Sequence, residues 1–167
     1  AHDCWVDVQR TNQSYQSIHL GDFGGSAGWA WAMAAADFDH NGYVDIIAGG
    51  TTSSLIKVLM TNNTGTGGTI TSIANTTFFK QNITLADFNN DGWVDVFACD
   101  DNAVAKMLLN TAGTLAVNSY VNFAVYPGNC GGGSDPCDSG NYGSAWVDFD
   151  NDGDLDLYIP HCRQSTT

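Results

Sequence analysis

Residues Asp148-Phe-Asp150-Asn-Asp152-Gly153-Asp-Leu-Asp156 form one of three nine-residue windows that repeat along the chain. The other two are Asp37-Phe-Asp39-His-Asn41-Gly42-Tyr-Val-Asp45 and Asp87-Phe-Asn89-Asn-Asp91-Gly92-Trp-Val-Asp95. Each window has Asp or Asn at positions 1, 3, 5 and 9 and Gly at position 6. Ten of the 18 acidic residues, all of which are Asp, occupy these four positions. An internal repeat of this kind determines how the whole chain should be interpreted.

The alternating oxygen side chains predict a loop that wraps around a calcium ion. Positions 1, 3, 5 and 9 would offer side-chain oxygens, position 7 would offer its backbone carbonyl, and Gly takes the sharp turn. Calcium is favoured over magnesium because a flexible loop with several protein oxygens suits about 6–8 ligands. No His or Cys recurs at ligand spacing, which argues against zinc or copper. For about three Ca²⁺ ions, the predicted ligands are Asp37, Asp39, Asn41, Tyr43, Asp45, Asp87, Asn89, Asp91, Trp93, Asp95, Asp148, Asp150, Asp152, Asp154 and Asp156.

Two alternatives to this calcium loop are an EF-hand and a set of plain turns. An EF-hand needs a bidentate Glu at position 12 and helices on both sides. Position 12 is Ala48, Ala98 or Ile159, and the flanking sequences favour strands. Three Asx-rich β-turns that bind nothing would account for the first six positions. They would not require a carboxylate at position 9, inside the following strand, in every window.

The repeat extends beyond the windows, whose first residues are 50 and 61 positions apart. Apolar segments that begin at Trp5, Leu55 and Val104 align, and β-like runs follow at 15–20, 69–79 and 114–125. One unit is therefore strand, strand, strand, ion loop and strand. The units span about 5–50, 54–99 and 104–162 of a single repeat domain, residues 1–167. An insertion at about 127–143 is predicted to be a surface loop pinned by a Cys130–Cys137 disulfide.

Four strands per unit predict an all-β fold of propeller-type blades, each with four antiparallel strands. The composition agrees, since few segments favour long helices. The windows between short apolar strands resemble the FG-GAP/VCBS repeat family, which includes the integrin α-subunit propeller. The resemblance implies calcium-loaded blades in extracellular adhesion or recognition proteins, with calcium bound by the Asp and Asn residues of the windows. Propellers in that family close with about seven blades, whereas this chain has three units.

The phase of the repeat predicts how the chain ends. If the strand after each ion loop pairs with the next unit, two blades are complete and Tyr15–Ala36 forms a half-blade. Segments Trp5–Asn12 and Leu155–Pro160 would then lack partners, and open edges of this kind are normally hidden or used. We expect head-to-tail pairing between copies, with Cys162 close enough to bond the partner's Cys4. This pairing would make a six-bladed ring of two chains or a filament. The alternative is a fragment of a longer propeller.

Charge and cysteine content narrow the function classes. The chain has five basic and 18 acidic residues, which give a net charge of −13. Nucleic acid is negatively charged and needs a basic surface, so this composition argues against nucleic-acid binding. Three bound calcium ions would reduce the formal charge to about −7. No apolar run approaches the roughly 20 residues of a membrane-spanning helix, so no membrane insertion is expected. Five Cys favour an oxidising, extracellular or cell-surface location, with Cys99 as the odd, buried thiol.

No catalytic motif is recognisable, so we do not expect an enzyme. His40 occupies a non-ligand window position and is expected to be solvated. The chain is interpreted as a secreted, calcium-binding structural or adhesive protein that self-assembles. The alternative is a glycan-binding, lectin-like module with Trp29 and Trp31 as its platform, and extracellular proteins are further possible partners. Four N-glycosylation sequons lie in predicted turns, at Asn12, Asn62, Asn75 and Asn82.

Overall fold

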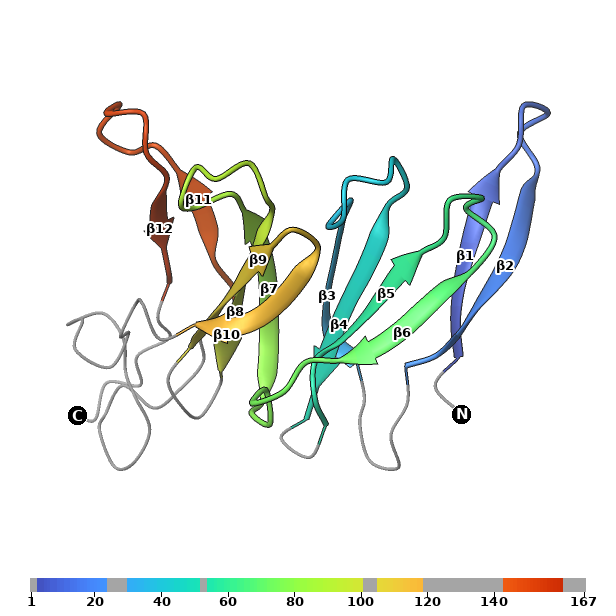
Figure 1. The fold of residues 1–167 in the computed structure, drawn as a ribbon, viewed down its shortest axis with the longest axis horizontal. Coiled ribbons are helices and arrows are strands. Elements are labelled where there is room, and N and C mark those ends of the chain that lie inside the picture. The colour runs from blue at the N-terminus through green and yellow to red at the C-terminus, as the bar shows by residue number, and fades with distance from the viewer. Residues whose placement is uncertain (1–2, 24–29, 52–53, 101–104, 119–142, 161–167) are drawn as a thin grey trace, which may run out of the picture.

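A computed structural model describes residues 3–23, 30–51, 54–100, 105–118 and 143–160 (Figure 1). All regular secondary structure in these residues is β, which confirms the predicted fold class. No helix among them is long and apolar enough to cross a membrane. The strands are β1 (Asp3–Gln9), β2 (Tyr15–Asp22), β3 (Ala30–Ala36), β4 (Asp45–Gly50), β5 (Lys57–Thr61), β6 (Gly68–Ser72), β7 (Lys80–Ala86), β8 (Asp95–Asp100), β9 (Lys106–Thr111), β10 (Thr114–Asn118), β11 (Ala145–Val147) and β12 (Asp156–Tyr158).

The strands form two complete antiparallel blades, β3-β4-β5-β6 and β7-β8-β9-β10, and two separate hairpins, β1–β2 and β11–β12. In both blades the strand after the ion loop pairs with the first strand of the next unit, as predicted. The assignment of Tyr15–Ala36 as a half-blade is wrong. A short turn after Gln9 joins β1 to β2, and β3 instead opens the first complete blade.

The two complete blades share the same strand order and equivalent strand pairing. Ile46 lies opposite Leu59 in the first blade, and Val96 lies opposite Leu108 in the second. Both first strands also carry an irregularity at the same place, near residue 31 in β3 and residue 81 in β7. The run predicted at 69–79 is shorter in the structure, because β6 ends at Ser72. Residues 119–125 of the run predicted at 114–125 lie outside the described residues.

We call β3–β4, β7–β8 and β11–β12 inner hairpins, because each encloses an ion loop, and β1–β2, β5–β6 and β9–β10 outer hairpins. Figure 1 shows the sheets arranged as a fan, with β1–β2 at one end and β11–β12 at the other. The first strands of the two complete blades, β3 and β7, lie side by side. Within the described residues, one edge of β1 and one edge of β12 have no strand beside them.

A single apolar cluster joins the two complete blades. It includes Phe38, Ile47 and Leu108, all without exposed surface, so burial of these side chains holds the blades together. Lys80 is also fully buried at this contact, and its Nζ donates hydrogen bonds to the carbonyls of Thr51 and Ser54. Burial lowers the pKa of Lys80 to about 8.

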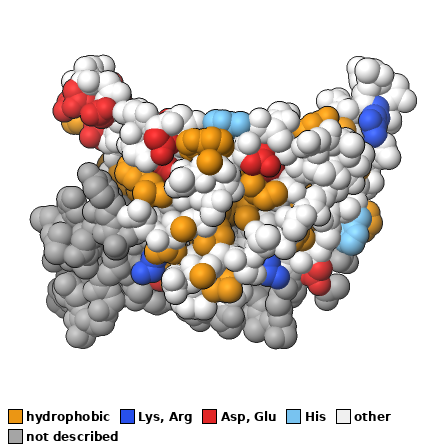
Figure 2. Space-filling model, viewed as in Figure 1, with side chains coloured by type: hydrophobic (Ala, Val, Ile, Leu, Met, Phe, Trp, Pro, Cys, Tyr) orange, Lys and Arg blue, Asp and Glu red, His pale blue; other side chains and the backbone are white. Residues whose placement is uncertain are grey.

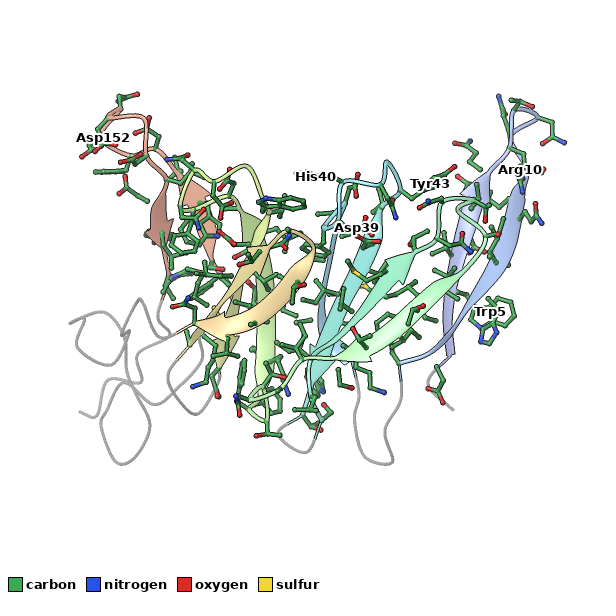
Figure 3. The ribbon with its side chains drawn as sticks, in the orientation of Figure 1. Trp5, Arg10, Asp39, His40, Tyr43 and Asp152 are labelled. Carbon is green, nitrogen blue, oxygen red and sulfur yellow. The ribbon has the colours of Figure 1, made fainter. Side chains whose placement is uncertain are left out.

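The two ends of the fan differ in charge. Figure 2 shows acidic side chains gathered at the loop between β11 and β12 and a basic side chain at the tip of the opposite hairpin. Figure 3 identifies these sites by Asp152 and Arg10. The chain has only five Lys and Arg residues in total. Arg10, just after β1, places one of these few positive charges at an end of the fan, where it would attract an acidic surface.

Candidate metal centres

The three windows form loops with the same hydrogen bonds. The position-1 carboxylate accepts from the N–H groups of positions 5 and 6, at 3.0 and 2.8 Å for Asp37, 3.0 and 2.8 Å for Asp87, and 3.1 and 3.1 Å for Asp148. The position-3 oxygen accepts from the N–H of position 5, and the position-5 oxygen accepts from the N–H of position 7. The oxygen side chains therefore shape each loop by themselves.

The backbone of the three loops is also the same. Position 4 adopts a left-handed conformation, with φ of 58° at His40, 56° at Asn90 and 60° at Asn151. Position 6 has φ of 88°, 88° and 97°, and no atom beyond the adjacent residues lies within 4 Å of where a Cβ would stand. Gly is thus required at position 6 by backbone conformation and not by lack of space.

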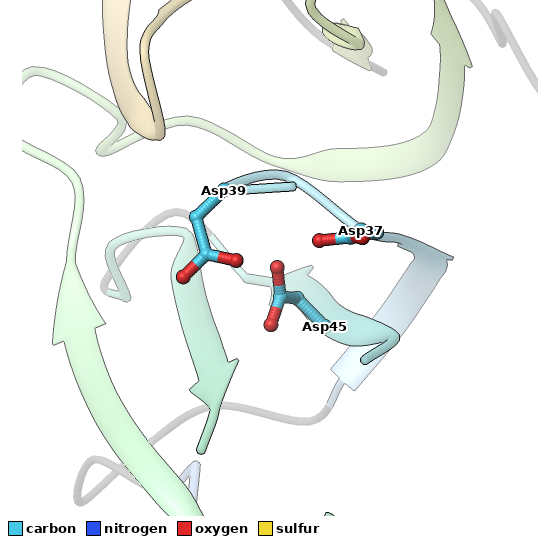
Figure 4. Close-up of side chains that lie close together, drawn as sticks. All are labelled: Asp37, Asp39 and Asp45. Carbon is cyan, nitrogen blue, oxygen red and sulfur yellow. The ribbon is translucent and has the colours of Figure 1, made fainter. Parts of the chain in front are cut away.

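Carboxylate oxygens gather in these loops. Figure 4 shows the side chains of Asp37, Asp39 and Asp45 pointing toward one another, and each offers an oxygen within 4.8 Å of the others. The side chains of Asp148, Asp150 and Asp156 are grouped in the same way. The second loop has Asn89 at position 3, so an amide oxygen replaces one carboxylate. Hard oxygen donors of this kind suit calcium. The position-7 backbone carbonyls of Tyr43, Trp93 and Asp154 remain predicted ligands.

In the first and second loops, the position-9 Asp accepts a hydrogen bond from the first strand of the next unit. Asp45 has no exposed surface, and its carboxylate accepts from the N–H groups of Phe38 at 2.8 Å and Thr61 at 2.7 Å. Asp95 is 1% exposed and accepts from the N–H of Asn110 at 2.8 Å. Its other oxygen, Oδ2, makes no hydrogen bond of normal geometry, but the N–H of Phe88 still lowers the pKa of this carboxyl.

Burial raises the pKa of both position-9 carboxyls, and that of Asp95 reaches about 6. The neighbouring loop carboxylates raise it further, because like charges disfavour ionisation. A buried carboxylate is costly unless a cation, a proton or hydrogen bonds compensate its charge. The burial of Asp95 among other loop carboxylates therefore favours a bound cation or a proton in the second loop.

The loops also contact one another along the fan. The ring of His40 lies flat on Trp93 of the second loop, with centroids 4.1 Å apart and an interplanar angle of 8°. His40 is exposed, as expected of a solvated position, and it makes this stacking contact in addition. Asn90 Nδ2 donates to Asp154 Oδ1 of the third loop at 2.9 Å. Nothing in the repeat pattern signals these contacts, because His40 and Asn90 both occupy the non-ligand position 4.

The predicted cysteine pairs remain predictions. Cys4 is partly buried and Cys99 is buried, and both are free thiols in this single chain. The other three predicted partners, Cys130, Cys137 and Cys162, lie outside the described residues, as does Trp29. Trp31 lies on β3, is 58% exposed, and has its ring centroid 5.6 Å from that of Phe79.

Three of the sequon asparagines, Asn12, Asn62 and Asn75, are exposed in loops between strands. The expectation that all four sequons lie in turns is wrong for Asn82. This residue is partly buried within β7, and its Oδ1 accepts a hydrogen bond from Ser144 Oγ at 3.1 Å.

Comparison with known families agrees with this geometry. Residues 87–159 match the FG-GAP-like repeat model, a segment that begins at the first residue of the second loop and ends just after the third. No curated protein and no solved structure matches the chain. The resemblance to FG-GAP repeats drawn from the windows is therefore confirmed over residues 87–159, which are similar to an FG-GAP-like repeat.

Proposed function

We propose that this chain is a secreted, extracellular calcium-binding repeat protein with a structural or adhesive role, whose copies associate head to tail through their end hairpins. The observation that carries the proposal is the pair of separate hairpins, β1–β2 and β11–β12, at opposite ends of the fan. The described strands make up three inner and three outer hairpins. The inner hairpin β11–β12 at one end of the fan has no outer hairpin beside it, and the outer hairpin β1–β2 at the other end has no inner hairpin paired with it. In this proposal the carboxylates serve a cation and not acid–base catalysis.

Exposed apolar surface supports the same association. Of the ten large hydrophobic side chains that are exposed among the described residues, six belong to the end hairpins or the third loop. These six are Trp5, Tyr15, Val147, Phe149, Leu155 and Tyr158. Apolar surface beside an open strand edge is normally covered, and a second copy offers an edge of the same kind.

Bound calcium would offset the repulsion among the loop carboxylates in the folded state. The chain carries a net charge of −13, and its carboxylates gather in groups whose oxygens lie within 4.8 Å. A bound ion neutralises this repulsion. Binding to the folded state alone would stabilise the protein as the calcium concentration rises.

Calcium titration calorimetry with matched variants tests the ion sites. The wild-type chain should take up about three ions, and Asp87→Asn, which alters position 1 of the second loop, should take up about two. Asn151→Gly is the control, because it changes only a left-handed, non-ligand position that Gly adopts freely. No calcium uptake by the wild-type chain would overturn the calcium proposal.

Light scattering and negative-stain electron microscopy, with and without chelator and reductant, test the assembly. Rings or filaments that dissociate under these treatments would support strand pairing reinforced by calcium and by a Cys4–Cys162 bond between copies. A monomer of 17.8 kDa in calcium would overturn head-to-tail association.

The exposure of Trp31 beside Phe79 favours glycan binding as a second candidate function. Aromatic faces of this kind stack on apolar faces of ligands. A glycan array with Trp31→Ala as the control separates the two functions. Saturable sugar binding that is lost in Trp31→Ala would favour a lectin, whereas a purely structural subunit should bind no sugar.

A further inference from the structure

The third ion loop lacks a contact that the first two loops have. Asp45 and Asp95 each accept a hydrogen bond from the N–H of a residue at the end of the next outer hairpin's first strand. Their equivalent in the third loop, Asp156, accepts from the N–H of Phe149 at 2.9 Å but from no such strand among the described residues. Asp156 is consequently exposed, whereas Asp45 and Asp95 are buried.

The Phe at position 2 is also less buried in the third loop than in the first two loops. Phe38 has no exposed surface, Phe88 is partly buried, and Phe149 is 82% exposed. The next complete blade covers the first loop, and its Asn110 Nδ2 donates to the Phe38 carbonyl at 2.9 Å. Only a hairpin follows the second loop among the described residues, and no described blade follows the third. The missing burial is therefore a property of the neighbour and not of the loop sequence.

The repeat identifies the residue that would complete the third loop. Alignment of the units places Thr11 in register with Thr61 and Asn110, the two residues whose N–H groups bind Asp45 and Asp95. Thr11 is exposed just beyond the open-edged strand β1. Strands β1 and β12 lie at opposite ends of the fan, and three blades are too few to close a ring. A Thr11 that reaches Asp156 would therefore belong to a second copy.

We propose that the third calcium loop is a composite site, completed when β1 of a second copy pairs with β12 and the partner's Thr11 donates its N–H to Asp156. The inference rests on the proposed function. The register of the complete blades places Leu157 opposite the partner's Gln9 and Tyr158 opposite the partner's Val8. The partner's Thr11 hydroxyl would donate to the Leu155 carbonyl, as Thr61 Oγ1 donates to the Val44 carbonyl at 2.8 Å.

Such a site couples calcium binding to assembly. Five of the nine residues in the third window are Asp, and Arg10 next to Thr11 brings a positive charge to the same junction. The third ion binds more tightly in the assembled protein, and by linkage it strengthens the assembly by the same factor. We expect about two ions per chain in dilute monomer and about three in the assembly.

Thr11→Pro removes the proposed donor with little effect on its hairpin. Thr11 is the second residue of the turn Arg10–Gln13, whose hydrogen bond runs from Gln13 N–H to the Arg10 carbonyl at 2.9 Å. Pro is favoured at this turn position but has no N–H. Thr11→Ser keeps the amide and the hydroxyl and is the matched control. Asp156→Ala removes the acceptor from an exposed position, together with the bond from the Phe149 N–H and a predicted calcium ligand.

A mixing experiment tests the composite site, with mass measured by light scattering in calcium. Thr11→Pro keeps an intact β12 end and Asp156→Ala keeps an intact β1 end. Each variant alone should need at least tenfold more protein to assemble, and Thr11→Ser should match the wild type. An equimolar mixture of the two variants should form a dimer of about twice 17.8 kDa.

The outcomes separate this inference from the proposed function. If Thr11→Pro assembles like the wild type and binds as many ions, or if the mixture stays monomeric, the composite site is wrong while the assembly stands. If the wild-type chain neither assembles nor binds calcium, the proposed function fails as well. Monomer melting temperatures of Thr11→Pro and Thr11→Ser, measured in dilute solution, should equal that of the wild type.

Discussion

Replacing Phe38 and Phe149 by Ala, one at a time, perturbs the same loop position in two very different environments. Phe38 has no exposed surface and belongs to the cluster that joins the complete blades, whereas Phe149 is 82% exposed. Truncating a buried Phe to Ala costs about 3–5 kcal/mol of unfolding free energy. An exposed substitution away from such packing usually changes it by no more than about 0.5 kcal/mol.

The order of the two effects reverses for association. If a second copy covers Phe149 as the second blade covers Phe38, assembly buries most of one Phe side chain. That burial is worth about 1.5–3 kcal/mol. Since about 1.4 kcal/mol corresponds to a tenfold change, Phe149→Ala should weaken association by about 10- to 100-fold.

Urea unfolding in dilute solution with saturating calcium measures the first effect, and light scattering over a protein concentration series measures the second. Phe88→Ala, at a partly buried position, should have an intermediate cost and keeps the series informative if Phe38→Ala does not fold. The reasoning is refuted if Phe149→Ala destabilises the dilute monomer as much as Phe38→Ala, or if it assembles at wild-type concentrations.

Three further predictions concern the calcium-free loop, the buried thiol and the loop glycine. Burial raises the pKa of Asp95 from 3.8 to about 6, so the folded state keeps a proton that the unfolded state releases. The melting temperature in chelator should therefore fall as the pH rises from about 4 to above 6, and a rise over this window would contradict the account. Burial raises the pKa of Cys99 to about 11, so a thiol reagent at pH 8 should modify it only on unfolding, after the more exposed Cys4. Gly92→Ala should cost about 1–2 kcal/mol in urea unfolding through its φ of 88° alone, since no atom crowds the new methyl group, and an unchanged midpoint would argue against this conformation.

The local structure of the ion loops could be predicted from the sequence because the repeat states it three times. Oxygen side chains at alternate positions bond the loop's own backbone, and Gly at position 6 meets a conformational demand that no neighbour imposes. The pairing of β4 with β5 also followed from the phase of the apolar segments. These features depend on residues close together in the chain.

Features that depend on neighbouring blades could not be predicted in this way. The stacking of His40 on Trp93 and the burial of Lys80 arise where residues 53 and 26 or more positions apart meet, and periodicity does not show which side chains face one another. The partner of β2 was misassigned for a related reason, because spacing locates strands without stating their pairing. The unequal burial of Phe38 and Phe149 has no counterpart in the sequence either, since both windows begin with Asp-Phe-Asp.

Native mass spectrometry of the 167-residue chain, in calcium and after chelation, tests the central claim most directly, because mass and ion count are read from one spectrum. The account predicts assemblies with about three calcium ions per chain that dissociate to monomers when calcium is removed. A 17.8 kDa species that carries no calcium and keeps the same mass under both conditions would contradict it.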